Sequence, residues 1–406
     1  MSARYLLPLG IALLGLACGG GTSTGNGGSD ATGHQDLAPG DAPADLAADA
    51  PTEAAPGETA DDVAADPGTT PDVAPDGVAP GADIVGGCQE CAYGTLKGLT
   101  CAPDGKTVVS GVTVSIDTVD CAGNPLHLET VSDAQGRYLL PQVPCGQQKV
   151  HLTKGSYAHA FDIWIDAGME VEAINGRCFG ATAAKIAVLT GKWDAIEYLL
   201  NNLKLKFDLY DSDDSDGGMS SGGMAMPLLQ DAKELAAYNV IFVNCGQVHS
   251  MIAGDPTVRK NLDDWVEKGG SFYGSDYADV YVNMIWPWAW DQPDAYSIFS
   301  QTVHAEVIDP PLFAYLGKMQ QDIQYQLGPI STVKAPGKNP TTGEDTMVHL
   351  RGEFKEYPGE VRPIMLSFRP YPKGGKVMFA NFHHEEQTGP LLAEVARILY
   401  WVVFEL

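Results

Sequence analysis

From Lys185 onward, short apolar runs alternate with amphipathic segments, and this alternation constrains the fold more than any other feature. The runs have the composition of buried strands: KIAVLTG (185–191), FDLYD (207–211), NVIFVNCG (239–246) and SFYGSD (271–276). Between them, apolar residues recur three or four positions apart, as on one face of a helix. Since parallel strands need crossover connections, this order predicts an α/β domain with a parallel sheet and helices on both faces.

The predicted α/β domain covers residues 184–406. Its helices are expected at 193–203, 231–238 and 258–270, and an irregular insert is expected at about 289–360. The strands PIMLSFR and KVMFANF and an apolar helix then close the domain. Because this last helix contains acidic and basic residues, we expect it to be buried in the core and not to span a membrane.

Residues 88–178 show the shorter period of half-buried strands. VSGVTVSID (109–117) places Val112, Val114 and Ile116 on one face, and the segments 149–157 and 160–168 repeat the alternation. This part of the chain is therefore predicted to be a separate β domain.

A motif in the β domain indicates a family. ETVSDAQGRYLLPQVPCG (129–146) contains a tight turn at Asp133 and Gly136, inward-pointing Tyr138 and Leu140, and a second turn at Pro144. This series resembles the carboxypeptidase regulatory-like, or transthyretin-like, domain. The resemblance implies a seven-stranded β-sandwich that serves as a spacer or adhesion module.

The N-terminus has the features of an exported lipoprotein. MSARYLLPLGIALLGLACGGG contains an apolar core that is too short to span a bilayer, followed by Cys18. Leu-Ala-Cys resembles the bacterial lipobox, although Gly15 stands where leucine is usual. We predict a signal peptide over 1–18 with lipidation at Cys18. The alternative is an ordinary signal peptide with a chance cysteine.

Residues 19–87 are interpreted as a disordered linker. They contain thirteen acidic residues and no lysine or arginine, among Gly, Ala, Pro, Thr and Ser, so they bury too little apolar surface to fold. The net charge is −27 and no basic stripe is present, so nucleic acid is not an expected partner. Gly19 after the cysteine favours the outer membrane and the cell surface. The expected partners are the membrane and an unidentified envelope protein or glycan, and no cofactor is expected.

Export also determines what the cysteines are expected to do. An oxidising compartment favours three disulfides among the six cysteines of the β domain. A zinc site is not expected, because no second pair with the spacing of Cys88-x-x-Cys91 follows in the sequence. Cys121 and Cys145 both flank turns and are candidates to pair, but the connectivity stays open. Cys245 remains alone and is predicted to be a buried apolar thiol. The disulfide candidates are Cys88, Cys91, Cys101, Cys121, Cys145 and Cys178.

Ligands of α/β sheets bind beyond the carboxyl ends of the strands. This rule selects a small set of polar and reactive residues as site candidates. They are Thr190, Gly191, Asp208, Asp211, Asn244, Cys245, Ser275, Asp276 and His383 to Glu386.

Two motifs among these candidates resemble class I glutamine amidotransferases. Phe382-His383-His384-Glu385 resembles the Phe-His-Pro-Glu end of that family, where His and Glu complete a Cys-His-Glu triad. WVEKGGSFYGSD (265–276) resembles the helix, Gly-Gly and strand that lead to its nucleophile elbow. The resemblance implies a flavodoxin-like α/β fold with triad positions at Asp276, His383 and Glu385.

The sequence departs from the family at the nucleophile. The Gly-x-Cys-x-Gly elbow corresponds to residues 274–278, where Asp276 occupies the cysteine position. Acyl transfer needs a nucleophile that the histidine can activate, whereas a carboxylate forms an ion pair with it. Glutamine hydrolysis is therefore not expected, and the domain is predicted to be a non-catalytic relic.

Two alternatives remain open for this set of residues. One is a cell-surface hydrolase that uses His383 with Ser275 or Asp276. The other is a divalent metal ion held by Asp276, by His383 or His384, and by Glu385 or Glu386, for which no HExxH-type spacing exists.

Two further features resemble binding sites but are predicted to be structural. DSDDSDGG (211–218) resembles a calcium loop, but Gly223 stands where an EF-hand needs a bidentate Glu, so a flexible acidic loop is predicted. IWPWAWDQP (285–293) could stack on sugars, but clustered tryptophans are more often part of a core.

Overall fold

The structure is a computed structural model that describes most of the chain after residue 90. The described residues are 91–174, 176–212, 223–246, 248–291, 294–326, 328–384 and 387–406. Several predictions fall on residues outside this set: the signal peptide, the linker, Cys18, Cys88, Glu385, Glu386 and most of the acidic loop 211–218.

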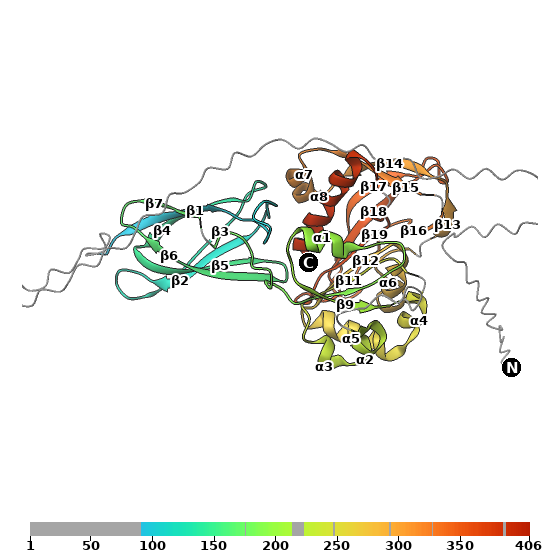
Figure 1. Ribbon diagram of the computed structural model, residues 1–406, viewed down its shortest axis with the longest axis horizontal. Helices are drawn as coiled ribbons and strands as arrows, with labels where there is room; N and C mark the ends of the chain where they lie inside the picture. The colour runs from blue at the N-terminus through green and yellow to red at the C-terminus, as the bar shows by residue number, and fades with distance from the viewer. Residues whose placement is uncertain are drawn as a thin grey trace, which may run out of the picture. The chain divides into compact units, whose positions relative to one another are not determined.

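The β domain contains two sheets, one of four and one of three strands (Figure 1). The four-stranded sheet has the order β3-β2-β5-β6 and is antiparallel throughout. In the sheet β4-β1-β7, β1 pairs antiparallel with β4 and parallel with β7. The strands are β1 (Tyr93–Leu99), β2 (Thr113–Val119), β3 (Pro125–Val131), β4 (Arg137–Pro144), β5 (Gly146–Lys154), β6 (Tyr157–Ile165) and β7 (Glu170–Ala173).

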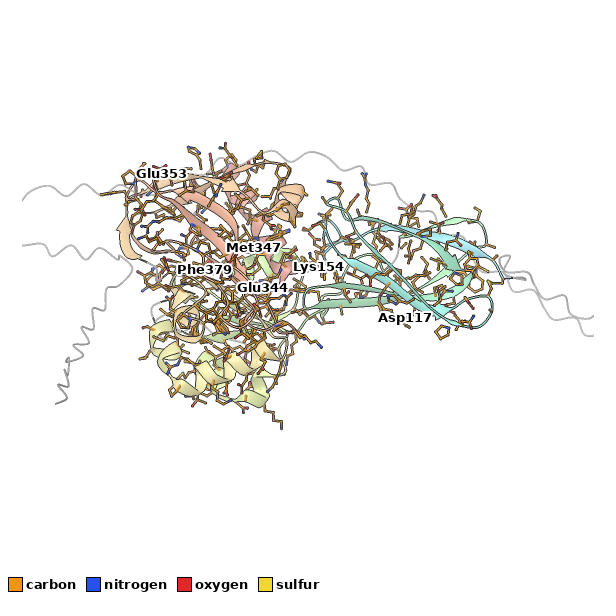
Figure 2. The ribbon with its side chains drawn as sticks, turned by 180° about the vertical axis from the view of Figure 1, so that it is seen from behind. Asp117, Lys154, Glu344, Met347, Glu353 and Phe379 are labelled. Atoms are coloured by element: carbon orange, nitrogen blue, oxygen red, sulfur yellow. A yellow bond between two sulfur atoms is a disulfide. The ribbon has the colours of Figure 1, made fainter. Side chains whose placement is uncertain are left out.

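Strand alternation directs the apolar residues of both sheets into one core. Val114 and Ile116 of β2 are fully buried, whereas their neighbour Asp117 is exposed and carries its carboxylate to the surface (Figure 2). Tyr138 and Leu140 of β4 enter the same hydrophobic cluster from the other sheet. Period-two burial of this kind is what the sequence predicted for these strands.

Two disulfides are described in the β domain, and they correct one sequence-based pairing. Cys91 is bonded to Cys121, and Cys101 is bonded to Cys178. Cys145 is also disulfide-bonded. Cys121 and Cys145 therefore do not pair with each other, because the turn after β2 lies beside the segment that precedes β1, with a Cα–Cα distance of 5.3 Å between Cys91 and Cys121.

The α/β domain is built on one ten-stranded sheet with the order β10-β9-β8-β11-β12-β19-β18-β17-β14-β15. Its first six strands are parallel and the remaining four are antiparallel. The strands are β8 (Ile186–Leu189), β9 (Phe207–Asp211), β10 (Gly223–Met224), β11 (Val240–Val243), β12 (Ser271–Ser275), β14 (Gln301–Val307), β15 (Gln320–Tyr325), β17 (Met347–Glu353), β18 (Val361–Phe368) and β19 (Val377–Ala380).

The central strands β9-β8-β11-β12-β19 run in the order second, first, third, fourth and fifth along the chain. This is the order of flavodoxin-like doubly wound sheets, in which ligands bind where the order reverses. In this protein the reversal lies between β8 and β11.

The insert differs from its prediction. The region expected to be irregular adds β14, β15 and β17 to the sheet as antiparallel strands, so the sheet is mixed and not purely parallel. A separate ribbon pairs β13 (Asp294–Ile298) with β16 (Gly328–Thr332). Strands of this kind carry period-two patterns that are short and easily missed between loops.

Helices cover both faces of the parallel part of the sheet (Figure 1). Alternate residues of β8 show the division: Ile186 and Val188 belong to the cluster that contains α1 and α8, and Ala187 and Leu189 to the cluster that contains α2 and α5. The helices are α1 (Ile196–Asn202), α2 (Ala225–Gln230), α3 (Ala232–Leu235), α4 (His249–Gly254), α5 (Pro256–Glu267), the 3-10 turn η1 (Asp276–Ala278), α6 (Asp279–Ile285), α7 (Pro310–Leu316) and α8 (Pro390–Glu405).

Two apolar segments are part of this core. The residues of α8 from Val395 to Phe404 are largely buried, and among the described residues no helix has the length and apolarity needed to cross a bilayer. Trp286 and Trp290 are also buried, and both pack against Phe368. Trp288 is half-buried and contacts the same ring, so this tryptophan cluster packs mainly into the core.

Candidate functional site

Asp276 lies on a sharp turn from strand to helix at the end of β12. Its φ is +43°, a left-handed conformation that is rare for a non-glycine residue. A Cβ at Gly274 would lie 2.9 Å from the Cβ of Ala278, so the turn closes only around small residues. This is the geometry of a nucleophile elbow, with an aspartate at its apex.

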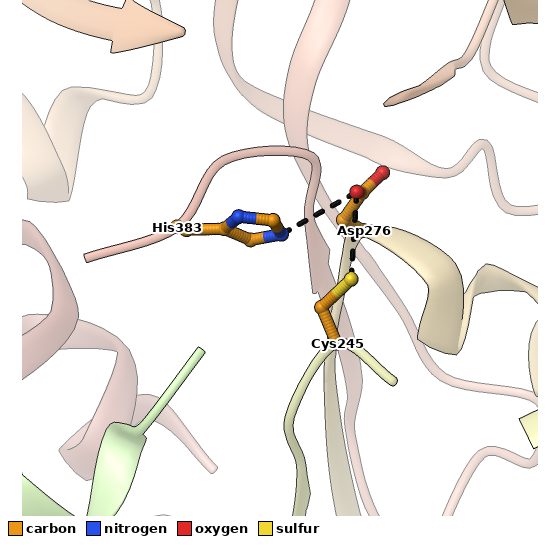
Figure 3. A group of neighbouring side chains, drawn as sticks. All are labelled: Cys245, Asp276 and His383. Atoms are coloured by element: carbon orange, nitrogen blue, oxygen red, sulfur yellow. Dashed lines mark hydrogen bonds and ion pairs between the residues drawn. The ribbon is translucent and has the colours of Figure 1, made fainter. Parts of the chain in front are cut away.

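The carboxylate of Asp276 lies beside His383 and Cys245 (Figure 3), and it also contacts the backbone of Ser331 in the β13–β16 ribbon. Its Oδ1 accepts a hydrogen bond of 2.7 Å from the backbone N–H of Ser331. Its Oδ2 lies 3.3 Å from His383 Nε2 and 3.5 Å from Cys245 Sγ. Three strand ends, those of β11, β12 and β19, thus bring a thiol, a carboxylate and an imidazole together.

This group is enclosed by protein. Cys245 and Asp276 are 0% exposed and His383 is 5% exposed. Ser331, which contacts the Asp276 carboxylate, belongs to β16 of the insert. The insert therefore covers the elbow. Because the three side chains are buried, a substrate in solvent does not reach them in this structure.

Cys245 has a different environment from the one predicted. It is buried and outside any disulfide, as expected for an apolar thiol, but its Sγ also lies 3.5 Å from the Asp276 carboxylate. The signal that could have located it is its position at the end of β11, beside β12 and at the reversal of strand order.

Ser275 is close to the group but is directed elsewhere. Its Oγ accepts a hydrogen bond of 3.0 Å from the backbone N–H of Cys245, and the residue is fully buried. The hydroxyl thus ties the end of β12 to the end of β11. This contact gives no support to Ser275 as the nucleophile of a hydrolase.

His384, which follows His383 in the chain, contacts a different carboxylate, that of Asp194. The backbone N–H of His384 donates to Asp194 at 3.3 Å. Burial lowers the pKa of the His384 side chain, an effect that the Asp194 charge partly offsets, so the imidazole is neutral near pH 7. Glu385 and Glu386, which the sequence proposed as triad or metal residues, lie outside the described residues.

The other predicted strand-end residues join neighbouring segments of the domain. Asn244 Oδ1 accepts from the N–H of Ile196 at the start of α1, and Thr190 Oγ1 donates to Asp211 at 3.3 Å. A side chain at Gly191 would overlap the carbonyl oxygen of Cys245, so glycine is required there. The remaining candidate, Asp208, accepts a hydrogen bond from Tyr238.

A second buried carboxyl group, which the sequence did not single out, lies close to the elbow. Asp279 is 5% exposed and accepts a hydrogen bond of 2.9 Å from Asn283 Nδ2, which is oriented by Trp290 Nε1. Burial and the nearby charge of Asp276 raise the pKa of Asp279 to about 8. Asp279 is thus protonated at neutral pH.

A distant buried cluster has Ser-His-Asp connectivity. His349 of β17 lies 2.9 Å from Asp309 Oδ2 through Nδ1 and 2.7 Å from Ser367 Oγ through Nε2. All three residues are at least 95% buried and Trp401 packs against the imidazole, so the cluster lacks the access that a hydrolase needs. It is best explained as a buried polar network.

This network should contribute to stability. Asp309→Ala removes the acceptor for a buried imidazole N–H, and we expect it to lower the free energy of unfolding by about 2 kcal/mol. Asp322→Ala removes the corresponding partner of the exposed His304 and should have little effect. Urea denaturation of both variants tests this, and equal losses would contradict a stabilising role of the buried network.

Comparisons with known proteins give only weak likenesses. No family model and no curated protein matches the sequence. The PurLQS structure from Thermotoga maritima is 10% identical with a TM-score of 0.34, over 54% of this chain and 97% of that chain. A glutamine amidotransferase from Thermotoga maritima is 10% identical with a TM-score of 0.32, over 53% of this chain and 80% of that chain. Gan42B, a GH42 β-galactosidase, is 10% identical with a TM-score of 0.32, over 55% of this chain and 30% of that chain. Likenesses of this extent identify neither a family nor a function.

Proposed function

We propose that the chain is a lipid-anchored envelope protein that displays a disulfide-bonded, transthyretin-like β domain together with a non-catalytic, amidotransferase-like α/β domain. Its role in this proposal is binding or structural, with an envelope protein or glycan as the partner. The lipid anchor at Cys18, the outer-membrane location and the linker 19–87 are supported by sequence alone.

The amidotransferase-like origin is supported by two independent features. The five central strands have the flavodoxin-like order, and the turn after β12 has the left-handed φ and small flanking residues of a nucleophile elbow. His383 follows β19 and reaches the apex of that elbow, as the sequence resemblance implied.

The lack of catalysis is supported by the residue at the apex. The Asp276 carboxylate is engaged by Ser331, His383 and Cys245 in a buried position. A carboxylate in this state neither attacks an amide carbonyl as a thiolate does nor meets a substrate from solvent. This enclosed carboxylate is the single observation on which the proposal depends most.

A thiol within reach of His383 makes one alternative specific. Cys245 could act as a relocated nucleophile, with His383 as the base, if the insert moved aside. The same experiment therefore has to address both Cys245 and the hydroxyl of Ser275.

Ammonia release from glutamine and labelling by electrophilic probes test the proposal. We expect the full-length wild-type protein to release no ammonia above background. We also expect it to be labelled by thiol- and serine-directed hydrolase probes no faster than Cys245→Ala and Ser275→Ala, respectively. Ammonia release that is abolished in Cys245→Ala, or serine-probe labelling that is abolished in Ser275→Ala, would overturn the non-catalytic assignment.

A further inference from the structure

The buried group under the insert combines three side-chain types that bind transition metals. Cys245, Asp276 and His383 come from the ends of three adjacent strands, and their ligand atoms all lie within 4.8 Å of one another. Thiolate, carboxylate and imidazole are the donors of protein zinc sites. The three side chains therefore offer a metal ion three suitable donor atoms at one place in the fold.

The contact between His383 and Asp276 is long for a hydrogen bond between an imidazole and a carboxylate. Its N–O distance is 3.3 Å, whereas the His127–Asp117, His304–Asp322 and His349–Asp309 pairs of the same protein measure 2.7, 2.6 and 2.9 Å. The exposed His127–Glu129 pair is longer, at 3.5 Å. Charge-assisted hydrogen bonds are normally about 2.7–2.9 Å long. The two atoms are thus close neighbours without the geometry of a short, direct bond.

The observed separations are those of ligands around a shared ion. With Zn–S of about 2.3 Å and Zn–O and Zn–N of about 2.0–2.1 Å, tetrahedral geometry places S and O about 3.5 Å apart and N and O about 3.3 Å apart. In this protein Cys245 Sγ lies 3.5 Å and His383 Nε2 lies 3.3 Å from Asp276 Oδ2. These two separations therefore fit an ion shared by the three side chains, whose ligand atoms all lie within 4.8 Å of one another.

The remaining contacts of Asp276 suit a ligand role. Its Oδ1 accepts the backbone N–H of Ser331, which fixes the plane of the carboxylate. Its Oδ2 is then the atom that faces both the sulfur and the imidazole nitrogen. Partners of this kind orient metal-binding carboxylates in other proteins and strengthen their binding.

We propose that Cys245, Asp276 and His383 bind one divalent ion of the zinc type. On binding, the Cys245 thiol releases its proton to solvent and forms the S–metal bond, while His383 binds as the neutral imidazole through Nε2. Three protein ligands leave one tetrahedral position for water. This set differs from the metal ligands considered from the sequence, because Cys245 takes the place given there to Glu385 or Glu386.

The ion site goes beyond the proposed function and does not depend on it. Metal binding is read from metal content and spectra, whereas the lack of catalysis is read from ammonia release and probe labelling. If the protein binds zinc and also hydrolyses glutamine, the metal site stands and the proposed function fails. If it binds no zinc and hydrolyses no glutamine, the metal site fails and the proposed function stands.

Cobalt substitution gives the sharpest test. Full-length protein, treated with a chelator and dialysed, would be titrated with Co²⁺ alone and then with Zn²⁺. We expect one Co²⁺ per chain, with the visible bands of tetrahedral cobalt and a near-ultraviolet thiolate-to-cobalt charge-transfer band. Among the described cysteines, Cys245 is the one outside a disulfide, so that band would report on it. Zn²⁺ should displace Co²⁺ and raise the melting temperature of the wild-type protein.

Two substitutions and a matched control complete the experiment. Cys245→Ser should abolish the charge-transfer band and His383→Gln should weaken Co²⁺ binding at least tenfold, while His304→Gln, on the surface of β14, should leave binding unchanged. Should the two site variants fail to fold, the wild-type spectrum still decides. Folded wild-type protein that binds no Co²⁺, or a charge-transfer band that persists in Cys245→Ser, would overturn the proposal.

Discussion

Replacing both Cys101 and Cys178 by alanine is expected to lower the free energy of unfolding by about 4 kcal/mol. The disulfide joins cysteines 77 residues apart and closes a loop that contains β2 to β7. Closing a loop of this length removes much of the conformational freedom of the unfolded chain, and the loss grows with the logarithm of loop length. Cys101 is also 99% buried, so its replacement by alanine removes packing inside the protein in addition to the disulfide.

The second described disulfide provides a matched control. Cys91 and Cys121 are only 30 residues apart. Replacing both by alanine should therefore lower the free energy of unfolding by roughly 0.5–1 kcal/mol less than the Cys101–Cys178 replacement does. Guanidinium denaturation under non-reducing conditions gives both values. A smaller loss for the Cys101–Cys178 variant than for the Cys91–Cys121 variant would show that loop closure does not determine the contribution of these bonds.

The central α/β strands could be predicted from sequence because their signal is local. FDLYD coincides with β9, β8 (IAVL) and β11 (VIFV) are apolar throughout, and every residue of β8, β11 and β12 is buried, as in strands covered on both faces. The insert was predicted less well. β14, over residues 301–307, buries every second residue, but this period-two pattern was not separated from the loops around it.

The candidate site was predictable only in part, for a related reason. Asp276 and His383 follow from motifs that are continuous in sequence. The approach of Cys245 to Asp276 depends instead on which strands are neighbours, and the pairing of Cys91 with Cys121 depends on how loops of the β domain fold back. Contacts of this type join residues 30 or 31 positions apart, and no local pattern in the sequence encodes them.

The buried carboxyl of Asp279 should make the stability of the protein unusually sensitive to pH. The pKa of Asp279 is raised from 3.8 to about 8, chiefly by burial and then by the charge of Asp276. Between these two values the folded protein keeps a proton that the unfolded chain has released. The free energy of unfolding therefore falls as the pH rises through this window, and the full loss is reached above pH 8.

Asp279→Asn should remove this dependence, because an amide stays neutral at every pH. One unit of pKa shift corresponds to about 1.4 kcal/mol, so the stability of the variant relative to wild type should increase by about 4 kcal/mol between pH 5 and pH 8. The measurement is urea denaturation at several pH values with a chelator present, so that a bound ion does not alter the field at Asp279. The exposed Asp345 provides the control, since Asp345→Asn should give a curve parallel to that of the wild type. If the Asp279→Asn curve were parallel as well, the carboxyl would be ionised at neutral pH, and the enclosed surroundings described for the elbow would have to be more open than their burial indicates.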